Sequence, residues 1–139
     1  MKVLGLDTST LLGSVALCDG AGLVAEVQAR VRATHSESLL DHVDRVLDLA
    51  ACKPIEIELV AFGKGPGSFT GLRIGLATAK GLALGAGIPL VGVSSLLVLA
   101  MNAAGARDPV GVVLDARRGE VFVAAYHLRS QAADVVLEP

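Results

Sequence analysis

A polar turn near the N-terminus carries the first residues whose types could do chemistry. Asp7, Thr8 and Ser9 follow a short apolar run at residues 3–6. Hydroxyls and turn amides can hold a phosphate, and an aspartate can hold Mg²⁺ through water. The same residue types are also common in ordinary polar hairpin turns. The sequence therefore leaves both a phosphate-binding turn and a structural turn open.

The glycine-rich segment at residues 63–71 is the richest motif in the chain. Gly65 and Gly67 permit close backbone approach, and Ser68 or Thr70 can cap the helix expected to follow. Free amides at a helix N-terminus form an anion site. The order of residues matches neither a P-loop nor a dinucleotide-binding fingerprint. An anion site and a rigid strand-to-helix connection are equally good interpretations.

Other reactive residue types do not group into a recognisable site. His35 and His42 are seven residues apart, whereas metal-binding pairs on helices usually lie four apart. Cys18 and Cys52 lack metal-ligand spacing and are expected to be reduced thiols. The charged turn at residues 115–120 could meet phosphate through its arginines, although a solvated hairpin tip is favoured. We expect no metal site and no catalytic triad.

The composition limits the class of protein. The 139 residues are 53% hydrophobic, 19% charged and only 3% aromatic, with a net charge of −2. Such a chain suits one ordinary domain and excludes a disordered protein. The near-zero charge and the few aromatic side chains argue against a chain that binds nucleic acid by itself. Because no signal peptide is recognisable, we expect a cytoplasmic protein.

Hydrophobic periodicity predicts an α/β architecture. Strands are expected at residues 2–7, 13–18, 22–31, 58–63 and 89–93. Helices are expected from a cap at Thr34 or Ser36 to about residue 51, from about 70 to 86, and from 95 to 104. The uncharged stretch at 81–106 is long enough to mimic a membrane span, but Gly85, Gly87 and Pro89 interrupt it. We therefore predict no membrane segment.

The last third of the sequence repeats the pattern of the first. Residues 110–115 and 119–124 form a strand, an aspartate, a short turn and a returning strand, as residues 3–7 and 13–17 do. A third strand is expected at about 133–137. The repeat indicates a duplicated protein with two lobes. We assign residues 1–106 to a complete first lobe and residues 107–139 to the beginning of a second, truncated lobe.

The helix expected after the glycine-rich segment is apolar on nearly every side. Gly71, Gly75 and Ala79 lie four residues apart, which lets another backbone approach closely. Arg73 and Lys80 share another face, and no acidic residue occurs between positions 59 and 106. We expect one side of this helix to pack on the sheet and another to lie in an interface with a partner.

One sequence run makes a family resemblance visible. Residues 65–75 read Gly-Pro-Gly-Ser-Phe-Thr-Gly-Leu-Arg-Ile-Gly, which resembles the bacterial TsaB (YeaZ-type) family, the dimerization subunit of tRNA threonylcarbamoyladenosine synthesis. Supporting motifs occur in the family's order: Asp7-Thr8-Ser9, His35-Ser36 before Leu39-Leu40, Ala79-Lys80-Gly81-Leu82-Ala83, the run at 89–96 and the run at 115–121. The resemblance extends over nearly the whole chain.

The resemblance implies an actin-like, ribonuclease H-like (ASKHA) fold with a mixed sheet and flanking helices. It also implies a partner of a catalytic TsaD-type subunit, which carries a His-x-x-x-His iron site where this chain has Val93-Ser94-Ser95-Leu96-Leu97-Val98-Leu99. We therefore expect a non-catalytic subunit without a metal. The family's pairing through its first two helices implies an interface at Leu39, Val43, Val46, Thr70, Gly71, Arg73, Ile74, Ala77 and Thr78.

The resemblance further implies a TsaE-type ATPase subunit as a third partner, a homodimer in isolation, and only indirect contact with tRNA. No cofactor of its own is expected, beyond weak or shared ATP or ADP binding at a degenerate phosphate site. That site would consist of Asp7, Thr8, Ser9, Gly65, Gly67 and Ser68. The alternative is a nucleotide-binding protein or an ATP-dependent phosphotransferase that uses the same residues.

Overall fold

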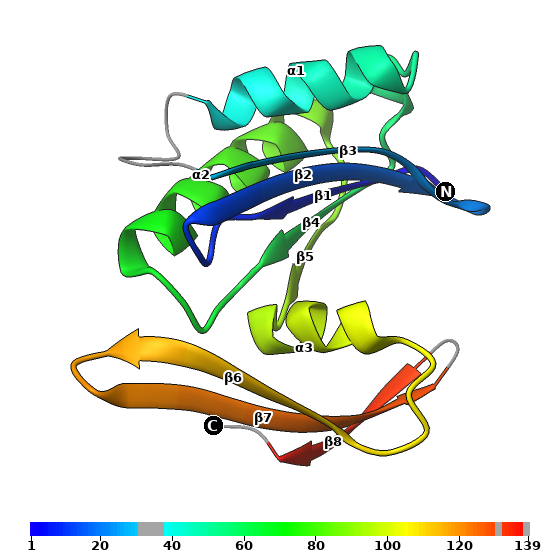
Figure 1. Ribbon diagram of the computed structural model, residues 1–139. Helices are drawn as coiled ribbons and strands as arrows, with labels where there is room; N and C mark the ends of the chain where they lie inside the picture. The colour runs from blue at the N-terminus through cyan, green and yellow to red at the C-terminus, as the bar shows by residue number, and fades with distance from the viewer. Residues whose placement is uncertain (31–37, 130–131, 138–139) are drawn as a thin grey trace.

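The computed structural model describes residues 1–30, 38–129 and 132–137, which form two β-sheets (Figure 1). The strands are β1 (Val3–Asp7), β2 (Leu12–Asp19), β3 (Gly22–Arg30), β4 (Leu59–Gly63), β5 (Leu90–Val93), β6 (Val110–Arg117), β7 (Glu120–Arg129) and β8 (Ala132–Leu137). The helices are α1 (Leu39–Leu49), α2 (Phe69–Ala86) and α3 (Ser95–Ala100), with short 3₁₀ turns η1 (Pro54–Glu56) and η2 (Met101–Ala103). The expected alternation of strands and helices is confirmed.

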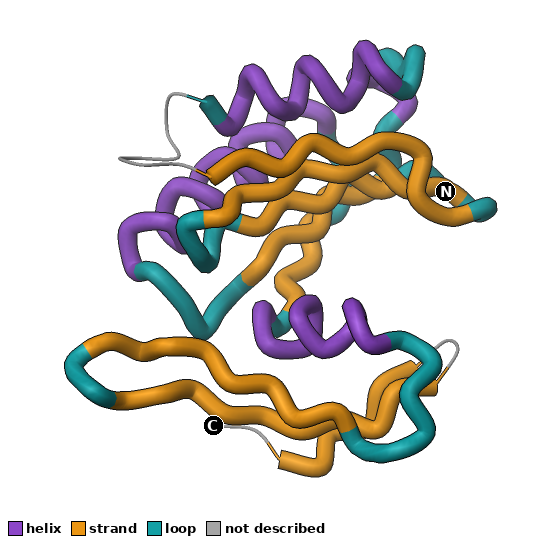
Figure 2. The backbone as a smooth tube through the Cα atoms, viewed as in Figure 1, coloured by secondary structure: helices purple, strands orange, loops and turns teal. Residues whose placement is uncertain are grey.

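The first sheet has the strand order β3-β2-β1-β4-β5. Strands β1, β2 and β3 form an antiparallel meander, while β4 pairs parallel with both β1 and β5. Helices α1 and α2 lie together on one side of this sheet (Figures 1 and 2). Because side chains alternate along a strand, Leu4 and Leu6 of β1 both point toward these helices and are buried.

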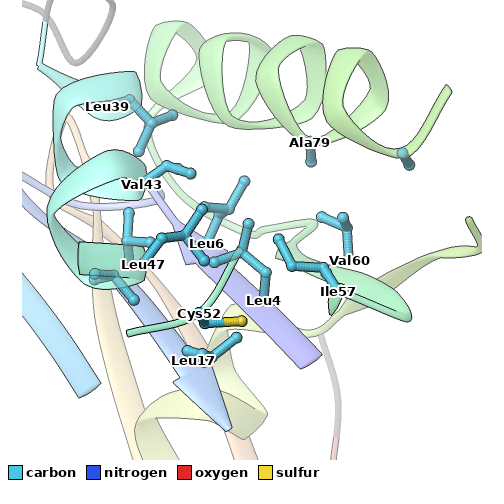
Figure 3. Packing of buried hydrophobic residues seen from close by; sticks show 13 residues of the cluster. Leu4, Leu6, Leu17, Leu39, Val43, Leu47, Cys52, Ile57, Val60 and Ala79 are labelled. Atoms are coloured by element: carbon cyan, nitrogen blue, oxygen red, sulfur yellow. The ribbon is translucent and has the colours of Figure 1, made fainter. Parts of the chain in front are cut away.

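The main hydrophobic core lies between this sheet and its two helices. Figure 3 shows leucine and valine side chains of α1 meeting those of β1 and β4. Both Cys18 and Cys52 are free thiols, as expected, and Cys52 is buried in this core. Burial, reinforced by the nearby carboxylates of Glu26 and Asp19, raises the pKa of the Cys18 thiol. A raised thiol pKa keeps Cys18 protonated and therefore a poor nucleophile at neutral pH.

The second sheet contains β6, β7 and β8 in an antiparallel meander, and α3 packs on one of its faces. The second core cluster joins Leu96 and Ala100 of α3 to Val112, Ala124 and Tyr126 of the strands. The predicted repeat of the first third of the chain in its last third is visible here, because each sheet contains an antiparallel three-stranded meander. The division at residue 106 stays a prediction, and α3 packs with the strands that follow it.

Most expected boundaries agree with the structure to within two or three residues. The expected caps Thr34 and Ser36, like His35, lie outside the described residues, and the residue that precedes α1 in the structure is Ser38. Helix α3 is shorter than expected, because it tightens into η2 after Ala100. Among the described helices, none has the length and apolarity needed to cross a membrane.

The turn between β6 and β7 places side-chain-bearing residues in a backbone conformation that favours glycine. The φ angles are +68° at Arg117, +57° at Arg118 and +80° at Gly119. The Arg117 amide donates to the Asp115 carboxylate over 2.7 Å, which fixes the entry into the turn. Two successive positive φ angles at Arg118 and Gly119 are typical of a type I′ hairpin, whose preferred sequence is Asn-Gly.

We expect Arg118→Asn to raise the free energy of unfolding by about 0.5–1 kcal/mol, because asparagine tolerates positive φ better than arginine. Chemical denaturation followed by circular dichroism measures this change. Arg107→Asn serves as the matched control, since Arg107 is exposed and does not have a positive φ. A loss of stability in Arg118→Asn would contradict the strain argument.

Candidate functional site

The polar turn after β1 is packed against the beginning of α2. The side chain of Thr8 is 1% exposed, and its Oγ1 donates to the Gly71 carbonyl over 2.7 Å. The Ser9 amide donates to Asp7 Oδ1 over 2.7 Å, which shapes the turn. The Ser9 carbonyl accepts from the Ser68 amide over 2.7 Å. Hydrogen bonds of Asp7, Thr8 and Ser9 therefore hold the turn together and join it to the start of α2.

Glycines make this close approach sterically possible. A Cβ at Gly71 would meet the Thr8 carbonyl oxygen, and one at Gly75 would meet Thr8 Oγ1, each at less than 3.0 Å. A Cβ at Gly67 would overlap Ser9, and one at Gly63 would overlap the Asp7 carboxylate. Real Cβ atoms essentially never approach so closely. The four-residue spacing of the α2 glycines therefore seats a turn rather than a second helix.

The structure brings together five of the six residues assigned to a phosphate site. Asp7, Thr8, Ser9, Gly67 and Ser68 lie in this contact, where the Ser9 amide bonds to Asp7, the Ser68 amide bonds to the Ser9 carbonyl, and Thr8 bonds to Gly71. The sixth, Gly65, exchanges two bonds with Ser95: its amide donates to Ser95 Oγ over 3.2 Å, and its carbonyl accepts from the Ser95 amide over 2.9 Å. The turn packs directly against the glycines at the start of α2, and phosphate binding by these residues stays a prediction.

A cleft of about 750 Å³ opens beside this contact, between the start of α2 and the β6–β7 hairpin. Ser9, Thr10, Gly67, Ser68 and Thr70 line it, whereas Asp7, Thr8 and Gly65 do not. Its remaining lining residues are Leu11, Leu12, Arg30, Phe69, Leu114, Asp115, Ala116, Arg117 and Phe122. Sequence reasoning missed Arg30, because it lies far from the other lining residues along the chain.

The outward side of α2 carries the larger apolar residues. Its fully buried positions are Gly71, Gly75, Ala79 and Ala83. On the opposite side, Phe69 is 73% exposed, Leu76 42% and Leu84 73%. At about 100° per residue, these three share one face with Arg73, Ala77 and Lys80. We call this face, Phe69, Arg73, Leu76, Ala77, Lys80 and Leu84, the outer stripe of α2.

The outer stripe continues into a small hollow. A cavity of about 150 Å³ is lined by Phe62, Gly63, Lys64, Phe69, Leu72, Arg73 and Leu76. The guanidinium of Arg73 lies over the Phe69 ring, 5.4 Å from its centroid, in a cation–π contact. Arg73, Lys80 and the nearby Lys64 are the only charged residues between positions 59 and 106. The surface is therefore apolar with a basic margin.

Several residues assigned to a partner interface are core residues in the structure. Leu39, Val43 and Val46 of α1 are exposed by only 1%, 3% and 0%, respectively, because the apolar stripe of α1 packs on its own sheet. Their assignment to an interface was wrong, and Gly71 is likewise buried beneath Thr8. Thr70, Arg73 and Ala77 are exposed as expected, whereas Ile74 and Thr78 are half-buried.

Within residues 1–30, 38–129 and 132–137, no cluster of three or more His, Cys, Asp or Glu side chains could hold a metal ion. The exposed residues of α1 are Leu40, Asp41, Asp44, Arg45, Asp48 and Leu49. Three carboxylates and one guanidinium make this side mostly acidic, and we call it the acidic strip of α1.

Substitutions at two glycines of α2 test the contact with Thr8. We expect Gly71→Ala to lower the free energy of unfolding by about 2 kcal/mol or more, because its Cβ would overlap a buried backbone carbonyl. Gly81→Ala is the matched control: its Cβ would meet nothing within 4 Å, so it should stabilise α2 by up to about 1 kcal/mol. Thermal and urea unfolding measure both; equal effects at the two positions would contradict the contact.

Comparisons with known proteins agree with this architecture. The family described as "TsaD: tRNA N6-adenosine threonylcarbamoyltransferase" matches residues 20–139. The tRNA threonylcarbamoyladenosine biosynthesis protein TsaB of Escherichia coli (strain K12) is 40% identical over 128 residues, which cover 91% of this chain and 55% of that protein. The TsaB protein of Bacillus subtilis (strain 168) is 33% identical over 137 residues, covering 99% and 60%. The chain thus spans little more than half of these relatives.

Solved structures give the same result. YeaZ from Pseudomonas aeruginosa superimposes with a TM-score of 0.90 at 33% identity, covering 99% of this chain and 65% of that one. A putative N-acetylmannosamine kinase from Listeria monocytogenes, at 13% identity and a TM-score of 0.52, shares the fold alone over 90% of this chain and 47% of that one. The chain has an actin-like α/β fold, is similar to the TsaB and YeaZ proteins, and belongs to the family described as "TsaD: tRNA N6-adenosine threonylcarbamoyltransferase".

Proposed function

We propose that this chain is a non-catalytic assembly subunit in the synthesis of tRNA threonylcarbamoyladenosine. The curated relatives carry the name of that pathway. The proposed partner is a TsaD-type catalytic subunit, which the chain would bind and activate. The observation that carries the proposal is the outer stripe of α2, where apolar side chains stand exposed along one face of a helix.

Burial of this stripe would supply the binding energy. Covering a phenylalanine or leucine side chain contributes about 1.5–3 kcal/mol, and Phe69, Leu76 and Leu84 are all available. The basic margin of Lys64, Arg73 and Lys80 favours a partner whose apolar patch is edged by carboxylates. The hollow beside Phe69 has room for one aliphatic or aromatic side chain of that partner.

The residues after β5 support a non-catalytic role. The resemblance places the catalytic subunit's iron-binding histidines after the equivalent strand. In this chain Ser94 caps α3 by accepting from the Leu97 amide over 3.5 Å, and its Oγ lies 3.4 Å from the Tyr126 hydroxyl. Ser95 binds Gly65, and Leu96 is buried in the second core cluster. These positions hold elements together, so their side chains serve packing.

A second copy of the chain is the proposed partner in isolation. Helix α1 carries the acidic strip and helix α2 the basic, apolar outer stripe, and the two helices lie on the same side of the first sheet (Figure 1). A twofold axis would place the acidic strip of each copy over the basic stripe of the other. We further propose that a TsaE-type ATPase subunit joins the complex. tRNA contact would fall mainly to the catalytic subunit, because this chain has a net charge of −2.

Ala77→Arg tests the outer stripe, because a long charged side chain there would hold a partner away. We expect affinity for the cognate catalytic subunit to fall at least tenfold, and tRNA modification in a reconstituted system to fall with it. Affinity is measured by calorimetry, and assembly by light scattering after size exclusion. Ile74→Asp would be a poor test, since Ile74 packs against the core.

Ala86→Arg is the matched control for Ala77→Arg. It makes the same substitution at an exposed position of the same helix, but roughly half a turn around the axis from Ala77. The control should bind normally. Unchanged binding by Ala77→Arg, with a folded protein, would exclude the outer stripe as the interface.

Nucleotide binding is the second candidate function, and the 750 Å³ cleft is the observation that favours it. Its size suits a nucleotide, and Arg30 and Arg117 could meet phosphates at its margin. This candidate predicts micromolar binding of Mg-ATP by calorimetry, weakened at least tenfold by Arg117→Ala. Arg107→Ala, outside the cleft, is the control. Absence of heat at millimolar nucleotide would end this candidate.

A further inference from the structure

Thr8 packs against two successive turns of α2. Its hydroxyl donates to the Gly71 carbonyl, and its side chain also lies directly beneath Gly75, four residues further along the helix. The Thr8 carbonyl lies equally close to Gly71. The buried side chain is therefore enclosed by the helix at both glycines, and its hydrogen bond has a defined direction.

The rest of the buried face of α2 is apolar. The fully buried residues after Gly75 are Ala79 and Ala83, and the half-buried Ile74 and Leu82 also pack against the core. Apolar contacts of this kind hold a helix against a sheet, but they are not directional. The hydrogen bond between Thr8 and Gly71 is directional and buried, so it can fix the position of the helix along its axis.

The rotation of α2 and its position along its axis determine which side chains form the exposed outer stripe. Phe69 and Arg73 flank Gly71 in sequence, and Leu76 follows Gly75, so the stripe begins on the same two turns that hold Thr8. A rotation of α2 by one residue would turn every side chain by about 100°. Such a rotation would replace the exposed Phe69, Leu76 and Leu84 by their neighbours.

We propose that Thr8 is a positioning residue for the partner surface, and that the turn of residues 7–9 holds α2 in place rather than holding a phosphate. The inference rests on the proposed function, because it assigns the outer stripe as the surface that is positioned. It also departs from the nucleotide site that an actin-like fold implies. The Thr8 hydroxyl is already bonded to α2, and the Ser9 amide is already bonded to the Asp7 carboxylate within the turn.

Thr8→Val removes the hydroxyl donor and keeps the shape of the side chain. We expect the amides of residues 72–79 to exchange with deuterium about tenfold faster or more, because the first turns of α2 lose a buried bond. We also expect affinity for the cognate catalytic subunit to fall about tenfold at a temperature where the variant is fully folded. Thr8→Ser restores the donor and should recover most of both quantities.

Thr10→Val is the matched control. Thr10 belongs to the same loop, but its hydroxyl bonds to the Leu12 backbone, and the atoms that a Cβ at Gly71 or Gly75 would meet belong to Thr8 and Ser68. It should change neither exchange in α2 nor affinity. If Thr8→Val fails to fold, Gly75→Ala replaces it, since its Cβ would displace the Thr8 hydroxyl while the helix gains propensity.

The outcomes separate this inference from the proposed function. Faster exchange with weaker binding, both recovered in Thr8→Ser, supports it. A lower melting temperature with unchanged affinity and unchanged exchange in α2 would overturn it and leave Thr8 a general stability residue. If the wild-type chain does not bind the catalytic subunit, the proposed function fails, and exchange in α2 alone decides whether Thr8 positions the helix.

A titration with phosphate and nucleotide completes the test. Inorganic phosphate and Mg-ATP are titrated into the wild-type chain and Thr8→Val, with the amide resonances of residues 7–10 and 67–71 as the readout. We expect no saturable shift at either segment. A saturable shift in the wild-type chain that Thr8→Val abolishes would overturn the proposal in favour of a phosphate-binding turn.

Discussion

The contact between one turn and one helix determines how the first lobe is arranged. The turn of residues 7–9 can approach α2 only because Gly67, Gly71 and Gly75 lack side chains. This approach places β1 centrally in the sheet and directs the smooth side of α2 inward. Where the turn meets Gly71 and Gly75, the inward side of α2 has no room for a large side chain, and Phe69 and Leu76 of the same turns are exposed. The steric requirement of this contact thus leaves outside the apolar surface on which the proposed function rests.

Helices α1 and α2 divide their roles differently, although both cover the same sheet. Helix α1 buries its leucines and valines in the core and turns its carboxylates outward. The fully buried residues of helix α2 are glycines and alanines, whereas Phe69, Leu76 and Leu84 are exposed. Exposed apolar surface costs solubility unless it is covered, so its retention on α2 is understandable in a protein that assembles with another. The acidic side of α1 gives the pair a polar margin.

Much of the fold could be predicted because the hydrophobic periodicity is local. The alternation in β1 and the spacing of Leu39, Val43 and Val46 correctly indicated a strand and a helix. The same pattern does not say what the apolar side of α1 packs against, and the family resemblance, which names helices and not their faces, led to a core face being assigned to a partner. The glycine-rich segment had two equally good interpretations, since its contact with Thr8 depends on residues 63 positions apart. Only the fold brings them together.

Helix α3 connects the two sheets, because it contacts the glycine-rich segment at its beginning and the second sheet along its length. Its first residue is tied to the glycine-rich segment through the paired bonds between Ser95 and Gly65, while its later residues belong to the second core. If α3 moves as a rigid body held at Ser95, a displacement at one end of the helix is transmitted to the other. Movement of the second sheet would therefore pivot near Ser95, and the β6–β7 hairpin would swing most. The width of the cleft at Arg117 would report that motion directly.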